Sequence, residues 1–131
     1  MKREGMRLLV VDFDYFFPVP QDPRDPLAPL FAWAHSETPY YLLEAWEERA
    51  LAFLLRGLSL PEARGWEGFW GRFAFAREAV LYYAESNALA FHPEVRRGVE
   101  EVVLFDAHHD AGYRPLGGEP ACDDWMVFYH R

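Results

Sequence analysis

The stretch LLVVDFD at residues 8–14 decides the fold, because VVLFDAHHD at residues 102–110 repeats its form. In each stretch, four apolar residues run directly into residues of the types that bind metal ions. Such runs are typical of strands buried on both faces of a parallel sheet, and these sheets bind ligands at the carboxyl ends of their strands. The two stretches therefore predict neighbouring parallel strands with a binding site where the strands end.

The candidate ligands follow each strand at a spacing of two residues. They are Asp12 and Asp14 after the first strand, and Asp106, His108 and Asp110 after the second. In an extended chain, residues two apart point to the same side, so an extended backbone would aim each set at one pocket. Carboxylates and imidazole without thiolate favour hard or borderline divalent cations such as Mn²⁺, Mg²⁺, Fe²⁺ or Zn²⁺. The structural alternative is that Asp12 and Asp106 cap helices or pair with arginines.

Composition limits the class of protein. The chain has 131 residues, of which 51% are hydrophobic, and we expect one globular domain over residues 1–131. A net charge of −8 argues against nucleic acid or an anionic membrane as partner. The single cysteine, Cys122, excludes an intramolecular disulfide and favours the reducing cytoplasm, and no apolar run approaches the length of a membrane span. The expected partner is a small-molecule substrate, and the sequence also allows a homo-oligomer.

Helices are expected between and after the two strands. Closely spaced prolines over residues 18–29 exclude a helix there, and this loop is either an active-site wall or a rigid connector. The expected helices run from the N-cap pair Thr38-Pro39 to Gly57, from Ser59 through a capping box at Glu62, from Phe75 to about Ser86, and from Trp125 onward. Asn87 either ends the third helix or, with Glu85, reaches the substrate. The predicted fold is α/β, a three-layer-like parallel sheet flanked by helices, with a metal site at the carboxyl ends of the strands.

The two ligand-bearing stretches resemble a known superfamily. Residues 106–110, Asp-Ala-His-His-Asp, are similar to the Asp-Ala-His-x-Asp signature of the arginase/deacetylase (ureohydrolase) superfamily, and residues 12–14 are similar to its Asp-x-Asp pair. Together with Asp124-Trp125-Met126, they most resemble the branch of that superfamily designated UPF0489. The order of the two motifs is reversed relative to the usual one, the chain is about half the expected length, and the segment that supplies a sixth, histidine ligand is missing.

The resemblance implies a metal-dependent hydrolase of C–N bonds of the amidine or amide type. It implies a binuclear Mn²⁺ or Zn²⁺ centre in which Asp12 and Asp106 bridge the ions, while Asp14, His108 and Asp110 complete the coordination. Hydroxide generated at the metals would be the nucleophile, with His109 or Glu85 as the catalytic proton shuttle. His92 and His109 are the candidates to replace the missing histidine.

Two other functions compete with this one. In a phosphatase of the haloacid dehalogenase type, Asp12 would be the nucleophile, Asp14 the acid/base, and Asp123 and Asp124 the magnesium ligands. That interpretation explains residues 12–14 but leaves residues 106–110 without a role. The other alternative is a non-catalytic relative that binds a metal or a protein partner, which the short chain and the missing ligand suggest.

Overall fold

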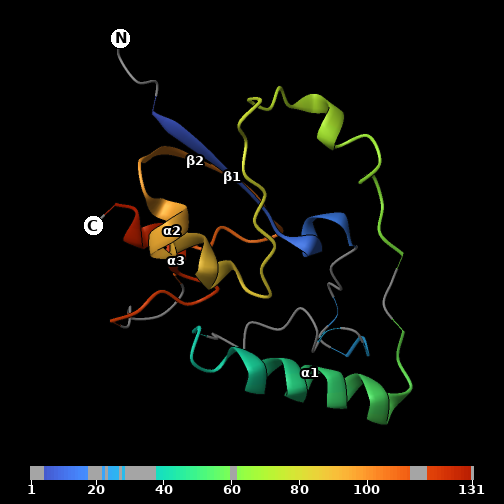
Figure 1. Ribbon diagram of the computed structural model, residues 1–131. Coiled ribbons are helices and arrows are strands. Elements are labelled where there is room, and N and C mark those ends of the chain that lie inside the picture. The colour runs from blue at the N-terminus through green and yellow to red at the C-terminus, as the bar shows by residue number, and fades with distance from the viewer. Residues whose placement is uncertain are drawn as a thin grey trace.

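The computed structural model describes residues 5–17, 22, 24–26, 28, 38–59, 62–112 and 118–130. In chain order the elements are β1 (Met6–Val11), η1 (Phe13–Phe16), α1 (Leu42–Arg56), η3 (Trp70–Arg72), η4 (Asn87–Phe91), α2 (Pro93–Arg96), β2 (Val99–Phe105) and α3 (Trp125–Phe128), where η marks a 3₁₀ helix. Both α2 and α3 pack against η4 beside the strands, whereas α1 runs apart from the sheet (Figure 1).

The two strands form a parallel pair, as the sequence predicts. Met6 lies opposite Val99 at one end, and Val11 lies opposite Phe105 at the other. Both strands therefore end at the same edge of the sheet, and the chain belongs to the mixed α/β class. The expectation that both faces of each strand are buried is wrong: no residue of either described strand is fully buried, and Val103 is 37% exposed. The described sheet has only two strands, and the described elements do not cover its faces fully.

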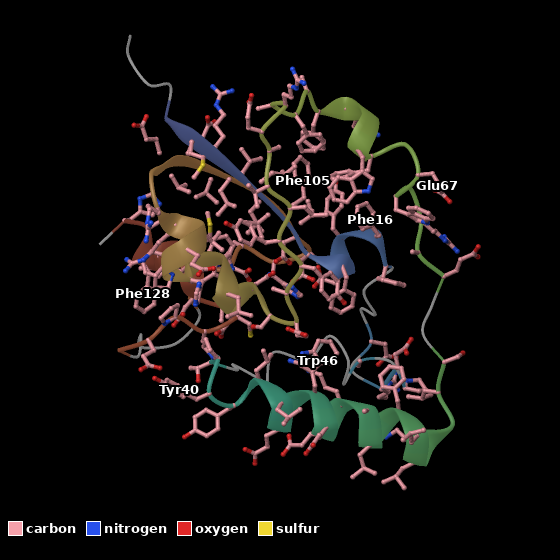
Figure 2. All side chains as sticks on the ribbon, in the orientation of Figure 1. Phe16, Tyr40, Trp46, Glu67, Phe105 and Phe128 are labelled. Atoms are coloured by element: carbon pink, nitrogen blue, oxygen red, sulfur yellow. The ribbon has the colours of Figure 1, made fainter. Side chains whose placement is uncertain are left out.

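Helix α1 ends where the sequence predicts but begins later. At its carboxyl end Gly57 adopts a left-handed conformation with φ +61°, and its N–H donates to the carbonyls of Phe53 and Leu54. At its amino end the predicted cap is wrong, because the Tyr41 N–H donates to the Thr38 carbonyl and closes a separate turn. Farther along, the Trp46 indole N–H donates to the Glu85 carbonyl at 2.8 Å, which ties α1 to the segment before η4 (Figure 2).

The predicted helix over residues 75–86 is absent from this described segment. A single turn closes between Ala76 and Ala79, and the rest has no regular structure. Phe75, Tyr82 and Tyr83, which the helical spacing places on the inner face, are 56%, 51% and 92% exposed, so this face is largely uncovered in the described residues. Isolated helices of this length are marginal without packing on that face, which explains the error. Instead of ending a helix, Asn87 begins η4.

Other predicted segments differ or fall outside the described residues. Residues 62–66 are not helical, so the capping-box helix does not form there, and residues 60 and 61 lie outside the description. Most of the proline-rich loop, including residues 18–21, also lies outside it. The last helix begins at Trp125, as predicted. Among the helices described, none has the length and apolarity needed to cross a membrane.

Two aromatic clusters surround the two large side chains that are fully buried among the described residues, Phe69 and Trp125. The Phe69 cluster consists of Tyr15, Phe16, Phe69, Trp70, Phe73 and Phe105. Phe69 is 2% exposed, and its ring centroid lies 5.0 Å from that of Phe105 and 5.1 Å from that of Phe16, both of which are labelled in Figure 2. The Trp125 cluster consists of Phe91, Trp125, Phe128 and Tyr129. The first cluster holds η1 against the end of β2, and the second holds α3 against η4.

Candidate metal centre

The first strand ends in a turn that carries two carboxylates. Asp12 follows β1 and caps η1, because its Oδ1 accepts the backbone N–H of Asp14 at 3.2 Å. The turn places Asp14, which is buried, beside the end of β2, where its Oδ1 accepts the Ala107 N–H at 3.1 Å. The expectation of an extended backbone is therefore wrong here. A capped 3₁₀ turn, rather than the alternation of a strand, aims these side chains.

The second strand also ends in a bend. Asp106 Oδ1 accepts the His108 N–H at 2.8 Å, so the chain turns directly after β2. Asp110 then adopts φ +49°, a left-handed conformation that aspartate tolerates better than most residues, and it is buried. Its carbonyl accepts the Met126 N–H at 3.1 Å, which fixes the bend against α3. Here too the expected extended backbone is wrong.

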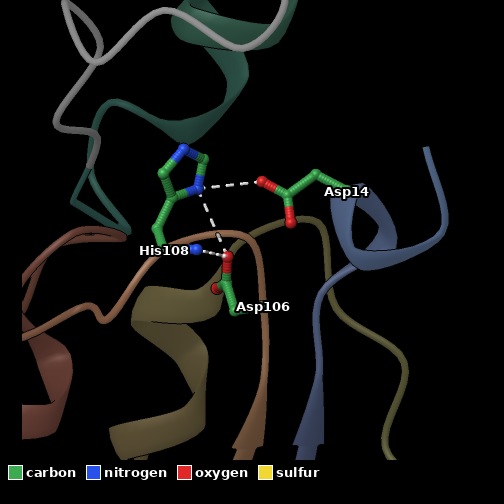
Figure 3. Close-up of side chains that lie close together, drawn as sticks. All are labelled: Asp14, Asp106 and His108. Atoms are coloured by element: carbon green, nitrogen blue, oxygen red, sulfur yellow. Dashed lines mark hydrogen bonds and ion pairs between the residues drawn. The ribbon is translucent and has the colours of Figure 1, made fainter. Parts of the chain in front are cut away.

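Three of the candidate side chains form a compact group (Figure 3). His108 Nδ1 lies 2.9 Å from Asp14 Oδ2 and 3.3 Å from Asp106 Oδ1. One potential ligand atom from each of the three residues lies within 4.8 Å of the others, so Asp14, Asp106 and His108 could hold a metal ion. Their side chains are 7%, 1% and 15% exposed, and this burial shields the group from water.

Asn87 joins the remaining carboxylates to this group. Its Nδ2 lies 2.6 Å from Asp12 Oδ2, 2.9 Å from Asp110 Oδ2 and 3.0 Å from Asp106 Oδ2. The sequence offered only a weak signal for this role, because a polar residue at the end of an expected helix is commonly a cap. The side chains of Asp12, Asp14, Asp106, His108 and Asp110 thus meet at one place through the described contacts.

The Trp125 indole supports one of these carboxylates. Its Nε1–H donates to Asp110 Oδ2 at 2.6 Å, and Trp125 is fully buried. The buried donor fixes the orientation of Asp110, whose backbone is already held by α3. The sequence placed Trp125 at the start of the last helix and in the string that resembles the UPF0489 branch, but it indicated no contact of Trp125 with the candidate ligands.

Replacing Trp125 with phenylalanine should weaken divalent cation binding while keeping most of the aromatic packing. The change removes the donor that orients Asp110, and losing such a supporting partner typically costs about 10–100-fold in metal affinity. Calorimetric titration with Mn²⁺ measures the effect. The matched control is Trp46→Phe, which removes an indole hydrogen bond to the Glu85 carbonyl instead. Equal affinities for Trp125→Phe and wild type would contradict the prediction.

Burial and mutual repulsion raise the pKa of every carboxyl group in the cluster. Desolvation is the largest cause for each, and repulsion by neighbouring carboxylates adds to it. The resulting pKa values are about 6 for Asp12, about 7 for Asp14, about 8 for Asp106 and about 6 for Asp110. Desolvation, and then the charge of His109, lower the pKa of His108 to about 4. Asp106 therefore holds its proton most strongly at neutral pH, and the imidazole of His108 is neutral, as a metal ligand must be.

These shifts predict an unusual pH dependence of stability in chelator. The four carboxyl groups have raised pKa values in the folded state, so that state binds more protons than the unfolded state between about pH 4 and about pH 8, and stability falls as pH rises through this window. The lowered pKa of His108 acts in the opposite direction below about pH 6.5, but it is one group against four.

We therefore expect the melting temperature in chelator to decrease from about pH 5 to about pH 8. Saturating Mn²⁺ should restore it at the upper end, because a cation relieves the repulsion that protons otherwise relieve. Thermal melting followed by circular dichroism measures both effects. A melting temperature in chelator that rises over this window would contradict the expectation.

The remaining candidate residues lie at the margin of the cluster or outside it. His109 and Glu85 are exposed; His109 directly follows His108 in the chain, and Glu85 lies two residues before Asn87. The Nδ1 atoms of His92 and His109 accept backbone N–H groups two residues on, at 3.4 Å and 3.0 Å. Asp123 and Asp124 are buried in the turn before α3, where Asp124 Oδ1 accepts the Ala121 N–H at 2.8 Å.

Comparison with known protein families, curated proteins and solved structures finds no match to this chain. The geometry of the cluster is therefore the main support for a function.

Proposed function

We propose that this chain is a metal-dependent hydrolase of C–N bonds of the amidine or amide type, acting on a small molecule. The observation that carries the proposal is the convergence of four carboxylates and one neutral imidazole at the ends of two parallel strands. The resemblance of residues 12–14 and 106–110 to the arginase/deacetylase superfamily supports the choice of reaction. It also supports a larger, three-layer α/β arrangement around the described sheet.

The donor set fits divalent cations. Asp12, Asp14, Asp106, His108 and Asp110 would hold them, and oxygen with imidazole ligands suits Mn²⁺ or Zn²⁺. Burial and mutual repulsion disfavour negative charge on these carboxyl groups and raise their pKa values, which supports a site where a cation would compensate that charge. Bound divalent cations would supply activation of water at neutral pH and polarisation of the bond to be cleaved.

The protein's own groups have separate tasks in this proposal. The capped turn at Asp12 and the bend at Asp106 fix the carboxylates before substrate arrives. His109 and Glu85, exposed beside the cluster, are suited to carry protons between the site and solvent. We expect His109→Ala or Glu85→Ala to lower kcat with little change in metal affinity, because neither side chain is assigned as a ligand.

An activity screen after metal loading tests the proposal. The protein is stripped with chelator, loaded with Mn²⁺ or Zn²⁺, and assayed on guanidino compounds, acetylated amines and phosphate esters. We expect C–N hydrolysis that requires the metal and is lost in Asp14→Asn. Glu101→Gln is the matched control, because it removes an exposed carboxylate of β2 that pairs with Arg7 at 2.7 Å, outside the cluster.

The alternatives give different results in the same screen. Hydrolysis of phosphate esters alone, lost in Asp12→Asn, would support a phosphatase of the haloacid dehalogenase type and overturn the proposal. Metal binding with no turnover of any substrate class would support a non-catalytic metal-binding protein. No metal binding at millimolar concentration would exclude the metal centre itself.

A further inference from the structure

Asn87 lies among three carboxyl groups of the cluster. It is the first residue of η4, and Ser86 fixes this start by accepting the Ala88 N–H through its hydroxyl. From there the side-chain nitrogen reaches oxygens of three different carboxylates, at 2.6, 2.9 and 3.0 Å. An amide nitrogen carries two protons, so it can donate hydrogen bonds to only two of these three oxygens at a time.

Asp106 faces two separate groups of ligand atoms. Its Oδ1 lies beside His108 Nδ1 at 3.3 Å, and its Oδ2 lies 3.0 Å from Asn87 Nδ2. One oxygen therefore faces the group of Asp14 and His108, while the other faces the place where Asp12, Asp110 and Asn87 meet. A carboxylate with this arrangement can serve two cations at once.

We propose that Asn87 is a ligand of a second cation, held with Asp12, Asp106 and Asp110, and that it binds this cation through Oδ1. This inference rests on the proposed metal centre and adds to it a ligand that is neither carboxylate nor imidazole. A carboxamide presents a donor nitrogen or an acceptor oxygen to the same place when it turns about its last torsion angle. Without a cation, the amide nitrogen donates hydrogen bonds to the carboxylates. When a cation is bound, the amide oxygen would coordinate it.

The neutrality of the amide has a consequence for the cluster. Four carboxylates already repel one another here, and a fifth negative ligand would increase that repulsion. Asn87 adds an oxygen ligand without adding charge. Hydrogen bonds from its amide nitrogen also lower the pKa of Asp12 and Asp110, which opposes the effect of burial.

The stoichiometry of Mn²⁺ binding tests the assignment through Asn87→Leu and Asn87→Asp. Leucine keeps a similar size but has no ligand atom, so we expect binding of the second Mn²⁺ to weaken at least about tenfold while the first remains. Aspartate keeps an oxygen ligand, so we expect two bound ions, together with a lower melting temperature in chelator because of the added charge. Calorimetry and native mass spectrometry measure the affinities and the number of ions. Ser86→Ala is the control, because it loosens the start of η4 without removing a ligand atom.

Nuclear magnetic resonance of the wild-type protein gives a second, independent readout. On titration with diamagnetic Zn²⁺, we expect the side-chain carbonyl carbon and amide protons of Asn87 to shift with the second equivalent. This measurement also decides the matter if Asn87→Leu does not fold. Asn87 resonances unchanged by Zn²⁺, or two Mn²⁺ bound by Asn87→Leu with wild-type affinities, would overturn the assignment.

The outcomes separate this inference from the function on which it rests. If wild type binds one cation and Asn87→Leu binds it equally well, the assignment of Asn87 fails and the metal centre stands. If wild type binds no divalent cation, the proposed function fails, and the assignment fails with it.

Discussion

Asp106→Asn should weaken Mn²⁺ binding by more than the roughly 10–100-fold typical of losing an outer-shell partner. Both oxygens of Asp106 face the cluster, one toward His108 and one toward Asn87, so a single change affects the whole site. In chelator, the same variant should be as stable as wild type or slightly more stable. With a pKa of about 8, Asp106 is largely protonated at neutral pH, and an amide resembles a protonated carboxyl group. Calorimetric titration and thermal melting measure the two effects.

Glu101→Gln is the control for charge, because it removes one negative charge from β2 at an exposed ion pair with Arg7. Its metal affinity should equal that of wild type. The metal-site interpretation would be wrong if Asp106→Asn were clearly destabilised in chelator and Mn²⁺ left the wild-type melting temperature unchanged. Asp106 would then act as a structural cap for the bend at His108.

Phe69→Ala should lower the free energy of unfolding by about 3–5 kcal/mol, the usual range for deleting a buried phenylalanine. Phe69 is 2% exposed, and its ring contacts aromatic rings from both η1 and β2. Metal affinity should fall as well, because these contacts hold Asp14 near the end of β2. Urea denaturation in chelator measures the stability, and calorimetry measures the affinity.

Phe75→Ala is the control for Phe69→Ala, because it makes the same substitution at a side chain that is 56% exposed. It should cost less than about 1 kcal/mol, since exposed positions contribute little. Similar small costs for Phe69→Ala and Phe75→Ala would show that the Phe69 cluster is not the main core of the described residues.

The strands were predictable from the sequence because their signal is local. At residues 8–11 and 102–105, four consecutive apolar residues are followed directly by an aspartate, a pattern that favours a buried strand over a helix. The structure pairs these two strands in parallel. The third predicted helix rested on spacing alone. Helical spacing stabilises a helix only when the apolar face is covered, and Phe75 and Tyr83 on that face are 56% and 92% exposed.

The convergence of the side chains at the strand ends was predictable from the sequence, but the geometry that produces it was not. Residue types near the strand ends indicated ligands, yet the turn capped by Asp12 and the left-handed backbone of Asp110 aim the side chains. Asn87 and Trp125 reach the cluster from segments distant in the chain. Such long-range contacts depend on how η4 and α3 pack, and no local pattern in the sequence encodes that packing.

At Asp110, the backbone requires a residue that tolerates a left-handed conformation, and the proposed cation site requires a carboxylate. Aspartate and asparagine both adopt φ +49° more easily than most residues, whereas only aspartate brings a negative charge to the cluster. A descendant of this chain could therefore exchange Asp110 for asparagine, keep an oxygen acceptor for the buried Trp125 indole, and so keep its shape while its attraction for a divalent cation falls. At this position, one substitution would separate the stability of the bend from the proposed binding of a cation.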